Sequence, residues 1–249
     1  MTGRAMVATL VLLPAIAVCQ GPVAPTVSVE FARTQRWARM DGDNWQYLRR
    51  GSSKDDDIVT DHAAPFSPPD VLRIVFTPDM GRDQEPSVHW TALDDAKAVD
   101  TAWWIKLSAN WSASPAGGGK MTFLHLAPDG QGQVYSNIGG SGPPHAITVN
   151  TEWEPYGQRV WTPNRTTTPI VYDRWYRIDW QVSLPTNRHD RSSGILRWWV
   201  DGVLNGDYDD VRVPEASRGF QQFEFAPTLQ NPPRDEQYMY IDHTLINAH

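Results

Sequence analysis

In the stretch Trp175-Tyr-Arg-Ile-Asp-Trp-Gln-Val-Ser-Leu184, apolar and polar side chains alternate from the second residue onward. The apolar residues that share one face are Tyr176, Ile178, Trp180, Val182 and Leu184. A repeat of two residues is the side-chain period of a β-strand, whereas a helix repeats every ~3.6 residues. The stretch therefore predicts a strand that buries one face and exposes the other.

The same pattern continues along the rest of the chain. Gly194–Asp201 alternates in the same way, and Asp201-Gly202 predicts a tight turn into a strand that returns at Val203. Further strands are predicted at Val27–Ala32, Asn44–Arg49, Val71–Phe76, Thr101–Ser108, Lys120–Leu126, Gln133–Ile138, Ala146–Val149, Phe220–Ala226 and Gln237–Ile246. Only Thr91–Val99 has a helical pattern. Many strands separated by proline, glycine and Asp or Asn predict an all-β antiparallel sandwich.

Length and charge narrow the class of protein. A chain of 249 residues with 40% apolar residues is large enough for one all-β domain with a folded core. The formal net charge of −7 makes nucleic acid an unsuitable partner, because binding to phosphates needs a positive surface. The chain has no apolar stretch of the ~18 residues that a membrane-spanning helix needs.

The N-terminus has the features of an export signal. Arg4 precedes the apolar run Met6–Val18, which is too short to span a membrane, and Ala15-Ile16-Ala17 is a small-residue cleavage site. We expect residues 1–18 to be a signal peptide, 19–28 a linker and 29–249 a single domain. The alternative is a lipoprotein signal, in which Cys19, the single cysteine, carries a lipid. The protein is thus expected to be secreted, or else anchored to a membrane through Cys19.

Four local signatures point to a family. They are Asp173-Arg-Trp-Tyr-Arg-Ile-Asp179, Gly194-Ile-Leu-Arg-Trp-Trp-Val-Asp-Gly202, Gly219-Phe-Gln-Gln-Phe-Glu-Phe225 and Tyr238-Met-Tyr-Ile-Asp-His243. Over roughly residues 100–246 the chain resembles the concanavalin-A-like jelly rolls of exported bacterial proteins. That group includes laminin-G-like domains, glucanases and polysaccharide lyases of the alginate-lyase and heparin-lyase-I types. The resemblance implies a two-sheet jelly-roll sandwich with a polysaccharide as its partner.

Alginate-lyase-type enzymes carry an Arg-x-Glu-x-Arg strand, a Gln-x-His strand and a late tyrosine-rich strand. Here Phe123-Leu-His125 has Phe in place of Gln, and Gln133-Val-Tyr135 has Tyr in place of His, so the motif is not intact. β-Elimination from a uronate needs a group that neutralises the carboxylate, a base that removes the neighbouring proton and an acid for the leaving oxygen. The resemblance assigns these roles as follows: His125 as base, Tyr238 or Tyr240 as acid, and Arg177, Arg197 or Gln133 as the neutralising group.

Two other functions remain open. The 12 tryptophans suit a non-catalytic carbohydrate-binding or adhesion domain, because an indole face matches the apolar face of a sugar ring. Strand parity turns Trp175, Trp199 and one ring of the Trp103-Trp104 pair away from the core, so these are the candidate stacking residues. A third function, a glucanase, would use Glu152 and Glu154 as its acids.

The sequence predicts at most a structural calcium ion and no required cofactor. Asp41 and Asp43 lie in an oxygen-rich loop of a kind that can hold a structural calcium ion. The histidines show no spacing typical of a zinc site, and no cofactor is required by the predicted chemistry. We expect a monomer whose only membrane contact is the lipid on Cys19.

Overall fold

The computed structural model describes residues 27–29, 45–65, 69–112, 119–126, 132–139, 142–153, 157–185, 193–212 and 219–249. Within these ranges the regular structure is β-strand, and there is no helix long and apolar enough to span a membrane. The strands form two antiparallel sheets, of eight and seven strands, which we call sheet A and sheet B. The prediction of an all-β, two-sheet sandwich is confirmed.

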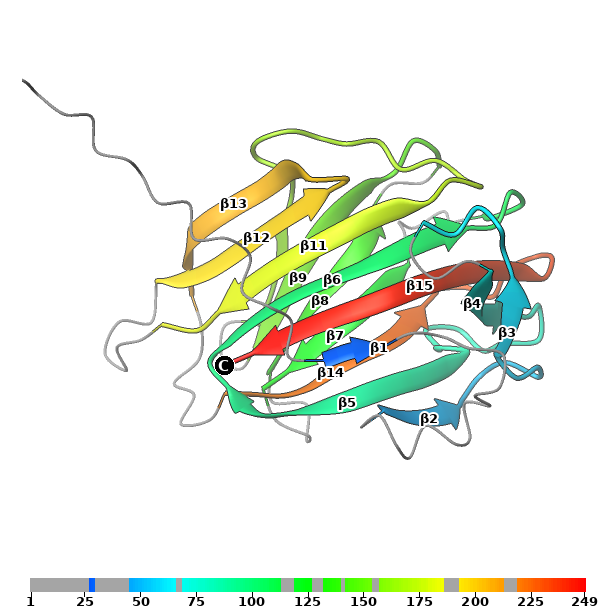
Figure 1. Cartoon of the computed structure of the whole chain (residues 1–249), viewed down its shortest axis with the longest axis horizontal. Coiled ribbons are helices and arrows are strands. Elements are labelled where there is room, and N and C mark those ends of the chain that lie inside the picture. Colours follow the sequence, from blue (N-terminus) through cyan, green and yellow to red (C-terminus); the bar gives the residue numbers. More distant parts are fainter. Residues whose placement is uncertain are drawn as a thin grey trace, which may run out of the picture.

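Sheet A contains the chain's longest strand near its centre (Figure 1). Its spatial order is β13 (Val203–Val211), β12 (Gly194–Val200), β11 (Tyr176–Ser183), β6 (Ala98–Leu107), β15 (Gln237–Ala248), β4 (Asp70–Phe76) and β3 (Asp57–Thr60). β1 (Val27–Val29) also pairs with the second half of β15. β15 therefore pairs with three other strands. Without it, β4 and β3 would have no hydrogen-bonded connection to β6, β11, β12 and β13.

Sheet B lies against sheet A and is assembled from strands that are far apart in sequence. Its order is β10 (Gly157–Trp161), β9 (Ala146–Trp153), β8 (Gly132–Gly139), β7 (Lys120–His125), β14 (Phe220–Thr228), β5 (Ser87–Ala96) and β2 (Trp45–Arg49). In both sheets we call the side turned away from the other sheet the outer face.

Large aromatic side chains fill the space between the sheets. Trp103 of sheet A lies 6.3 Å from Phe223 and 6.2 Å from Phe225 of sheet B, measured between ring centroids. Trp180 and Trp198 are 1% and 0% exposed. Alternate residues of each strand supply this core, as the predicted period of two requires.

The turn between β12 and β13 has the predicted geometry. Asp201 and Gly202 have φ angles of 50° and 75°. Two successive positive φ values are the mark of a type I′ hairpin turn, whose twist matches that of the paired strands. The Asp-Gly dipeptide therefore identified a strand connection correctly.

The helix predicted at Thr91–Val99 is wrong. These residues end β5 in sheet B and begin β6 in sheet A, so the chain crosses between the sheets here. Thr91 and Leu93 are buried while Ala92 is exposed, which is a strand pattern. Asp95 has a φ of 69°, and its Oδ1 accepts a hydrogen bond from the Gly219 amide at 2.5 Å. Packing and this corner outweigh the helical propensity of the alanines.

Candidate functional site

The structure places the predicted catalytic residues on different sheets. His125 on β7 and Gln133 on β8 are cross-strand partners in sheet B. The remaining ones lie on strands of sheet A: Arg177, Arg197, Tyr238 and Tyr240. The prediction that His125 acts together with Tyr238 or Tyr240 is therefore corrected, because β15 joins sheet A and holds both phenols on the opposite side of the sandwich.

The structure also changes the list of candidate stacking residues. Trp103 is 0% exposed and packs in the core, so it has no ring face for a ligand. Its neighbour Trp104 is the half-buried, outward-facing ring of that pair. Trp175 and Trp199 are half-buried on the sheet A side, as parity predicted. The correction for Trp103 follows from which of two adjacent rings faces inward, which sequence alternation alone does not decide.

The outer face of sheet B carries a second apolar cluster, separate from the sandwich core. It consists of Val88, Phe123, Tyr135 and Ala226, with the partly buried Trp90 packed against them. We call these residues the sheet B floor. Its first four members are 1–8% exposed although they point away from sheet A, and Trp90 is partly exposed. Apolar side chains on a solvent-side face are normally exposed, so the surrounding groups shield this floor from water.

His125 lies beside the floor and is paired with Glu224. The His125 Nε2 and Glu224 Oε1 atoms are 2.7 Å apart, and the two side chains are 17% and 12% exposed. The imidazole stacks on Phe123 with an interplanar angle of 5°. Gln222 donates from its Nε2 to the second carboxylate oxygen of Glu224 at 2.8 Å. The ring of His125 is thus fixed in orientation by an acid and by an aromatic neighbour.

A second network lies across β8, β9 and β10 on the same face. Glu152 accepts hydrogen bonds from Gln133 Nε2 at 2.5 Å and from the Tyr135 hydroxyl at 2.7 Å. The Tyr135 oxygen in turn accepts from Asn150 at 3.0 Å and from Gln158 at 2.6 Å. Burial and the neighbouring Glu152 raise the pKa of Tyr135, so its hydroxyl stays protonated.

In both networks a glutamate carboxylate is the central acceptor, and the groups bonded to it determine how its charge is balanced. The carboxylates of Glu152 and Glu224 are held by amide, phenol and imidazole groups, and no Arg or Lys of the described chain bonds to either. Lys120 is near, but its Nζ lies over the ring of Tyr135, 4.7 Å from the centroid. The face therefore presents two oriented carboxylates beside an apolar floor, with Lys120 as the neighbouring cation over the rings of Phe123 and Tyr135.

The outer face of sheet A is built differently, since three of its acids, Asp57, Asp179 and Asp207, bond to arginines, while Asp100 accepts from the Gln181 amide. Arg177 bonds to Asp179, with Nη2 and Oδ1 2.6 Å apart, and Arg197 bonds to Asp207 at 2.7 Å. Burial raises the pKa of Asp179, although the Arg177 guanidinium opposes this effect. The pKa of Asp207 lies below its usual value because of hydrogen bonds from Arg197 and Arg165.

Cations also cover the aromatic rings of this face. Lys106 Nζ lies 5.4 Å from the Trp175 ring centroid and 4.8 Å from that of Tyr240, and it pairs with Asp61. The Trp175 indole N–H donates to Asp61 at 3.0 Å. Arg177 lies over Trp104 at 5.1 Å. The faces of these rings are therefore already in contact with cations of the protein, which leaves less ring surface for stacking on a sugar.

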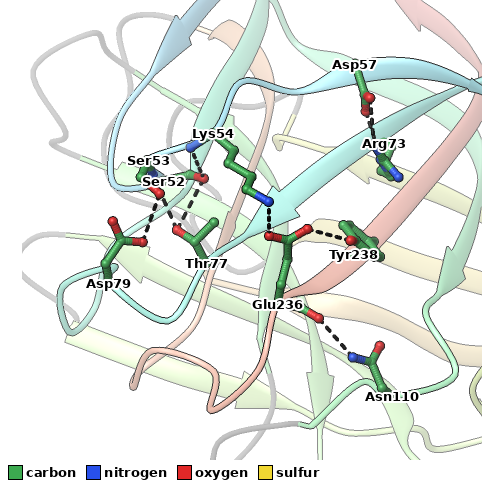
Figure 2. Close-up of polar contacts among 10 residues, drawn as sticks. All are labelled: Ser52, Ser53, Lys54, Asp57, Arg73, Thr77, Asp79, Asn110, Glu236 and Tyr238. Carbon is green, nitrogen blue, oxygen red and sulfur yellow. Dashed lines mark hydrogen bonds and ion pairs between the residues drawn. The ribbon is translucent and has the colours of Figure 1, made fainter.

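Figure 2 shows that Tyr238 belongs to this paired surface. Its hydroxyl donates to Glu236 at 2.5 Å, and Lys54 forms an ion pair with the same carboxylate. Arg73 binds Asp57 through two hydrogen bonds at 2.8 and 2.7 Å, and its guanidinium lies over the Tyr238 ring. The hydrogen bond with Glu236 raises the pKa of Tyr238.

A serine, a histidine and an aspartate meet inside the sandwich but do not form a hydrolytic triad. His89 Nε2 lies 2.6 Å from Asp56 Oδ2 and 3.3 Å from Ser87 Oγ, so both partners approach the same ring nitrogen. A triad needs the acid and the nucleophile on opposite nitrogens. Asp56 also accepts from the Val75 amide at 3.1 Å, so the pair links sheet B to sheet A. Its role is structural.

Several predicted residues lie outside the described ranges: Cys19, Asp41, Asp43 and Glu154. The lipid anchor, the calcium loop and the Glu152/Glu154 pair are therefore not described by the structure. Among the residues that it does describe, no group of His, Cys, Asp and Glu is arranged to hold a metal ion.

Sequence reasoning missed Glu224 and Gln222 as site residues. A signal was present, because in Phe220-Gln-Gln-Phe-Glu-Phe225 the acid and the amide share the face opposite Phe223. Alternation does not show which strand lies alongside, however. Glu224 meets His125 across 99 residues of sequence, through the pairing of β14 with β7.

Comparison with known proteins supports the fold. No family model matches this chain, and no curated protein sequence matches it. Among solved structures, the endo-β-1,4-glucuronan lyase of the fungus Trichoderma reesei is similar, with a TM-score of 0.61 and 12% identity over 91% of this chain and 96% of that chain.

Two further structures are similar to a comparable extent. The alginate lyase vAL-1 from a Chlorella virus has a TM-score of 0.58 and 12% identity, covering 84% of this chain and 94% of that chain. The carbohydrate recognition domain of Emp47p has a TM-score of 0.53 and 11% identity, covering 89% and 94%. At these identities the likeness shows the fold: this chain is a jelly-roll sandwich.

Proposed function

We propose that this protein is a carbohydrate-active jelly-roll protein that binds a polysaccharide on the outer face of sheet B. One observation carries the proposal: the partly exposed rings of Trp90 and His125 lie on the sheet B floor beside the hydrogen-bond networks of His125–Glu224 and Tyr135–Glu152. A sugar presents apolar C–H faces and hydroxyl groups together, so its binding site needs apolar surface and fixed polar groups side by side.

The structural neighbours support the same class of ligand. By their printed names, two act on glucuronan or alginate and one carries a carbohydrate recognition domain. We extend from them only the class of partner, a polysaccharide. The export signal predicted at residues 1–18 fits a ligand outside the cell, with the lipid on Cys19 as the alternative anchor and a monomer as the expected state.

Affinity electrophoresis in gels containing neutral or acidic polysaccharides tests the proposal. Migration should be retarded in at least one gel, and His125→Ala should weaken the apparent affinity about tenfold. Arg197→Ala, a change of similar size on the outer face of sheet A, is the matched control and should leave retardation unchanged. Equal losses in both variants, or free migration in every gel, would contradict the proposal.

A second candidate function, β-elimination from a uronate, is favoured by the geometry of His125. Its Nε2 is occupied by Glu224, and its Nδ1 has no hydrogen-bond partner among the described residues. A histidine held in this way can serve as a base through Nδ1. Gln133, the cross-strand partner of His125, would hold the uronate carboxylate. Water would protonate the leaving oxygen, because the Tyr135 hydroxyl is buried and donates to Glu152.

The lyase candidate has a direct assay. Incubation with alginate, glucuronan and heparin should produce the ultraviolet absorbance of an unsaturated uronate, and His125→Ala should abolish it while Arg197→Ala retains it. Constant absorbance with every polyuronate would remove this candidate and leave polysaccharide binding as the function.

A further inference from the structure

We infer that the outer face of sheet B selects an uncharged glycan and rejects a polyuronate, with Glu152 and Glu224 as the residues that set this preference. The inference rests on the proposed polysaccharide-binding function and names the ligand class of that site. It is an alternative to the second candidate function, β-elimination from a uronate, and it differs from the activities in the printed names of the lyase neighbours, which act on glucuronan and alginate.

The argument begins with what holds the two acids. Each carboxylate has both oxygens occupied: Glu152 by Gln133 and Tyr135, and Glu224 by His125 and Gln222. Amides and a phenol orient a carboxylate without cancelling its charge. Of the groups bonded to the two acids, only the imidazole of His125 can carry positive charge. Lys120 is the neighbouring cation, and its Nζ lies over the rings of Tyr135 and Phe123, so one lysine faces two carboxylates.

The second step is the location of these charges. Glu224 is 12% exposed, and Tyr135 beside Glu152 is 1% exposed. Charges in such partly buried positions are screened less than charges on an open surface. A polyuronate laid across the sheet B floor, from β9 to β14, would bring its carboxylates toward both acids, and like charges placed together oppose binding.

The third step is what an uncharged sugar gains from the same groups. Carboxylate oxygens are strong acceptors for hydroxyl donors, and each has more than one acceptor position. The amides of Gln133 and Gln222, which are only partly buried, add donors and acceptors that carry no charge. A neutral polyol therefore satisfies this face without added charge. A uronate brings further negative charge to a face where Lys120 already stands against two carboxylates.

Matched pairs of oligosaccharides test the inference by isothermal titration calorimetry. Cellohexaose is compared with the hexamer of β-1,4-glucuronic acid, and β-1,4-mannohexaose with the hexamer of β-1,4-mannuronic acid. Within each pair only the group at carbon 5 changes, from hydroxymethyl to carboxylate. At low salt the wild-type protein should bind a neutral hexamer at least about tenfold more tightly than its acidic counterpart.

Charge-neutral variants identify the residues responsible. The double variant Glu152→Gln/Glu224→Gln should reduce the neutral-to-acidic preference by about tenfold or more. Asp209→Asn/Asp210→Asn, which removes the same charge from exposed positions on β13, is the control and should leave the preference unchanged. An unchanged preference in the glutamine variant, or wild-type binding to an acidic hexamer as tight as to its neutral partner, would overturn the inference.

The salt dependence of the wild-type protein gives a test that needs no variant. Raising salt from about 20 mM to about 300 mM shortens the screening length, so binding of an acidic hexamer should tighten while neutral binding stays constant. Acidic binding that weakens with salt would contradict the inference while leaving the proposed function intact. Failure of all four hexamers and of the polysaccharide gels would overturn both.

Discussion

The two outer faces of the sandwich handle their acids in opposite ways. On sheet A, Asp57, Asp179 and Asp207 each bond to an arginine of the same sheet. On sheet B, Glu152 and Glu224 bond to amide, phenol and imidazole groups. A paired surface charge has little left to offer a ligand and adds little stability. An oriented acid without a bonded Arg or Lys keeps its capacity to accept hydrogen bonds, and this difference supports our proposal that sheet B is the binding face.

The aromatic residues differ less between the two faces. On sheet A, Lys106 and Arg177 lie over the rings of Trp175 and Trp104. On sheet B, Phe123 and Tyr135 pack against each other, with centroids 5.2 Å apart, and Lys120 lies over both rings. A count of tryptophans therefore does not distinguish the two faces, because each face has aromatic rings covered by the protein's own cations.

The largest expected effect tests the assignment of inner and outer sides on β6. Trp103→Ala removes the ring that contacts Phe223 and Phe225 and should cost about 3–5 kcal/mol of unfolding free energy. Trp104→Ala, one residue away on the outer face, should cost about 1 kcal/mol. Urea unfolding measures both values. Similar losses would mean that the two rings are not divided between core and surface.

A smaller effect compares one hydroxyl on each face. Tyr135→Phe leaves Glu152, Asn150 and Gln158 each short of a partner in a buried network, at a cost of about 1–3 kcal/mol. Tyr238→Phe removes a single bond to Glu236, which keeps its ion pair with Lys54, and should cost about 0.5 kcal/mol. Chemical denaturation of both variants measures these losses of unfolding free energy. Equal losses would contradict the difference between the two faces.

The smallest expected effect concerns the stability of the protein at low pH. The pKa of Asp207 in the folded protein lies below its ordinary value of 3.8, because Arg197 and Arg165 donate hydrogen bonds to it. Its contribution to stability is therefore present above pH 3.8 and is lost as the pH falls through the lower folded-state pKa. Asp207→Asn should flatten the fall in melting temperature below pH 3.8, whereas Asp209→Asn on the same strand should not. Parallel pH profiles for wild type and Asp207→Asn would contradict this.

The fold could be predicted from the sequence to a large extent, because its causes are local. The alternation in Trp175–Leu184 gave β11, and Asp201-Gly202 gave the turn between β12 and β13. The Thr91–Val99 segment failed because its conformation is set by a crossing between sheets, where Asp95 binds Gly219 from a distant strand.

The site could be predicted only in part, and the reason is topological. Parity says which face of its own strand a residue occupies, and so it separated Trp180 from Trp199. It does not say which sheet the strand joins. His125 and Tyr238 were grouped by residue type, yet β7 and β15 belong to different sheets. Glu224, the actual neighbour of His125, arrives through strand order.

The position of β15 has a consequence for the order of assembly. This strand covers residues Gln237–Ala248 and holds β6 on one side and β4 and β1 on the other. Until it is in place, β4 and β3 have no hydrogen-bonded connection to β6, β11, β12 and β13 within sheet A. A ribosome must therefore have made residue 248 before sheet A can close, and we expect folding to follow synthesis and to be slow, since its decisive pairings span most of the chain.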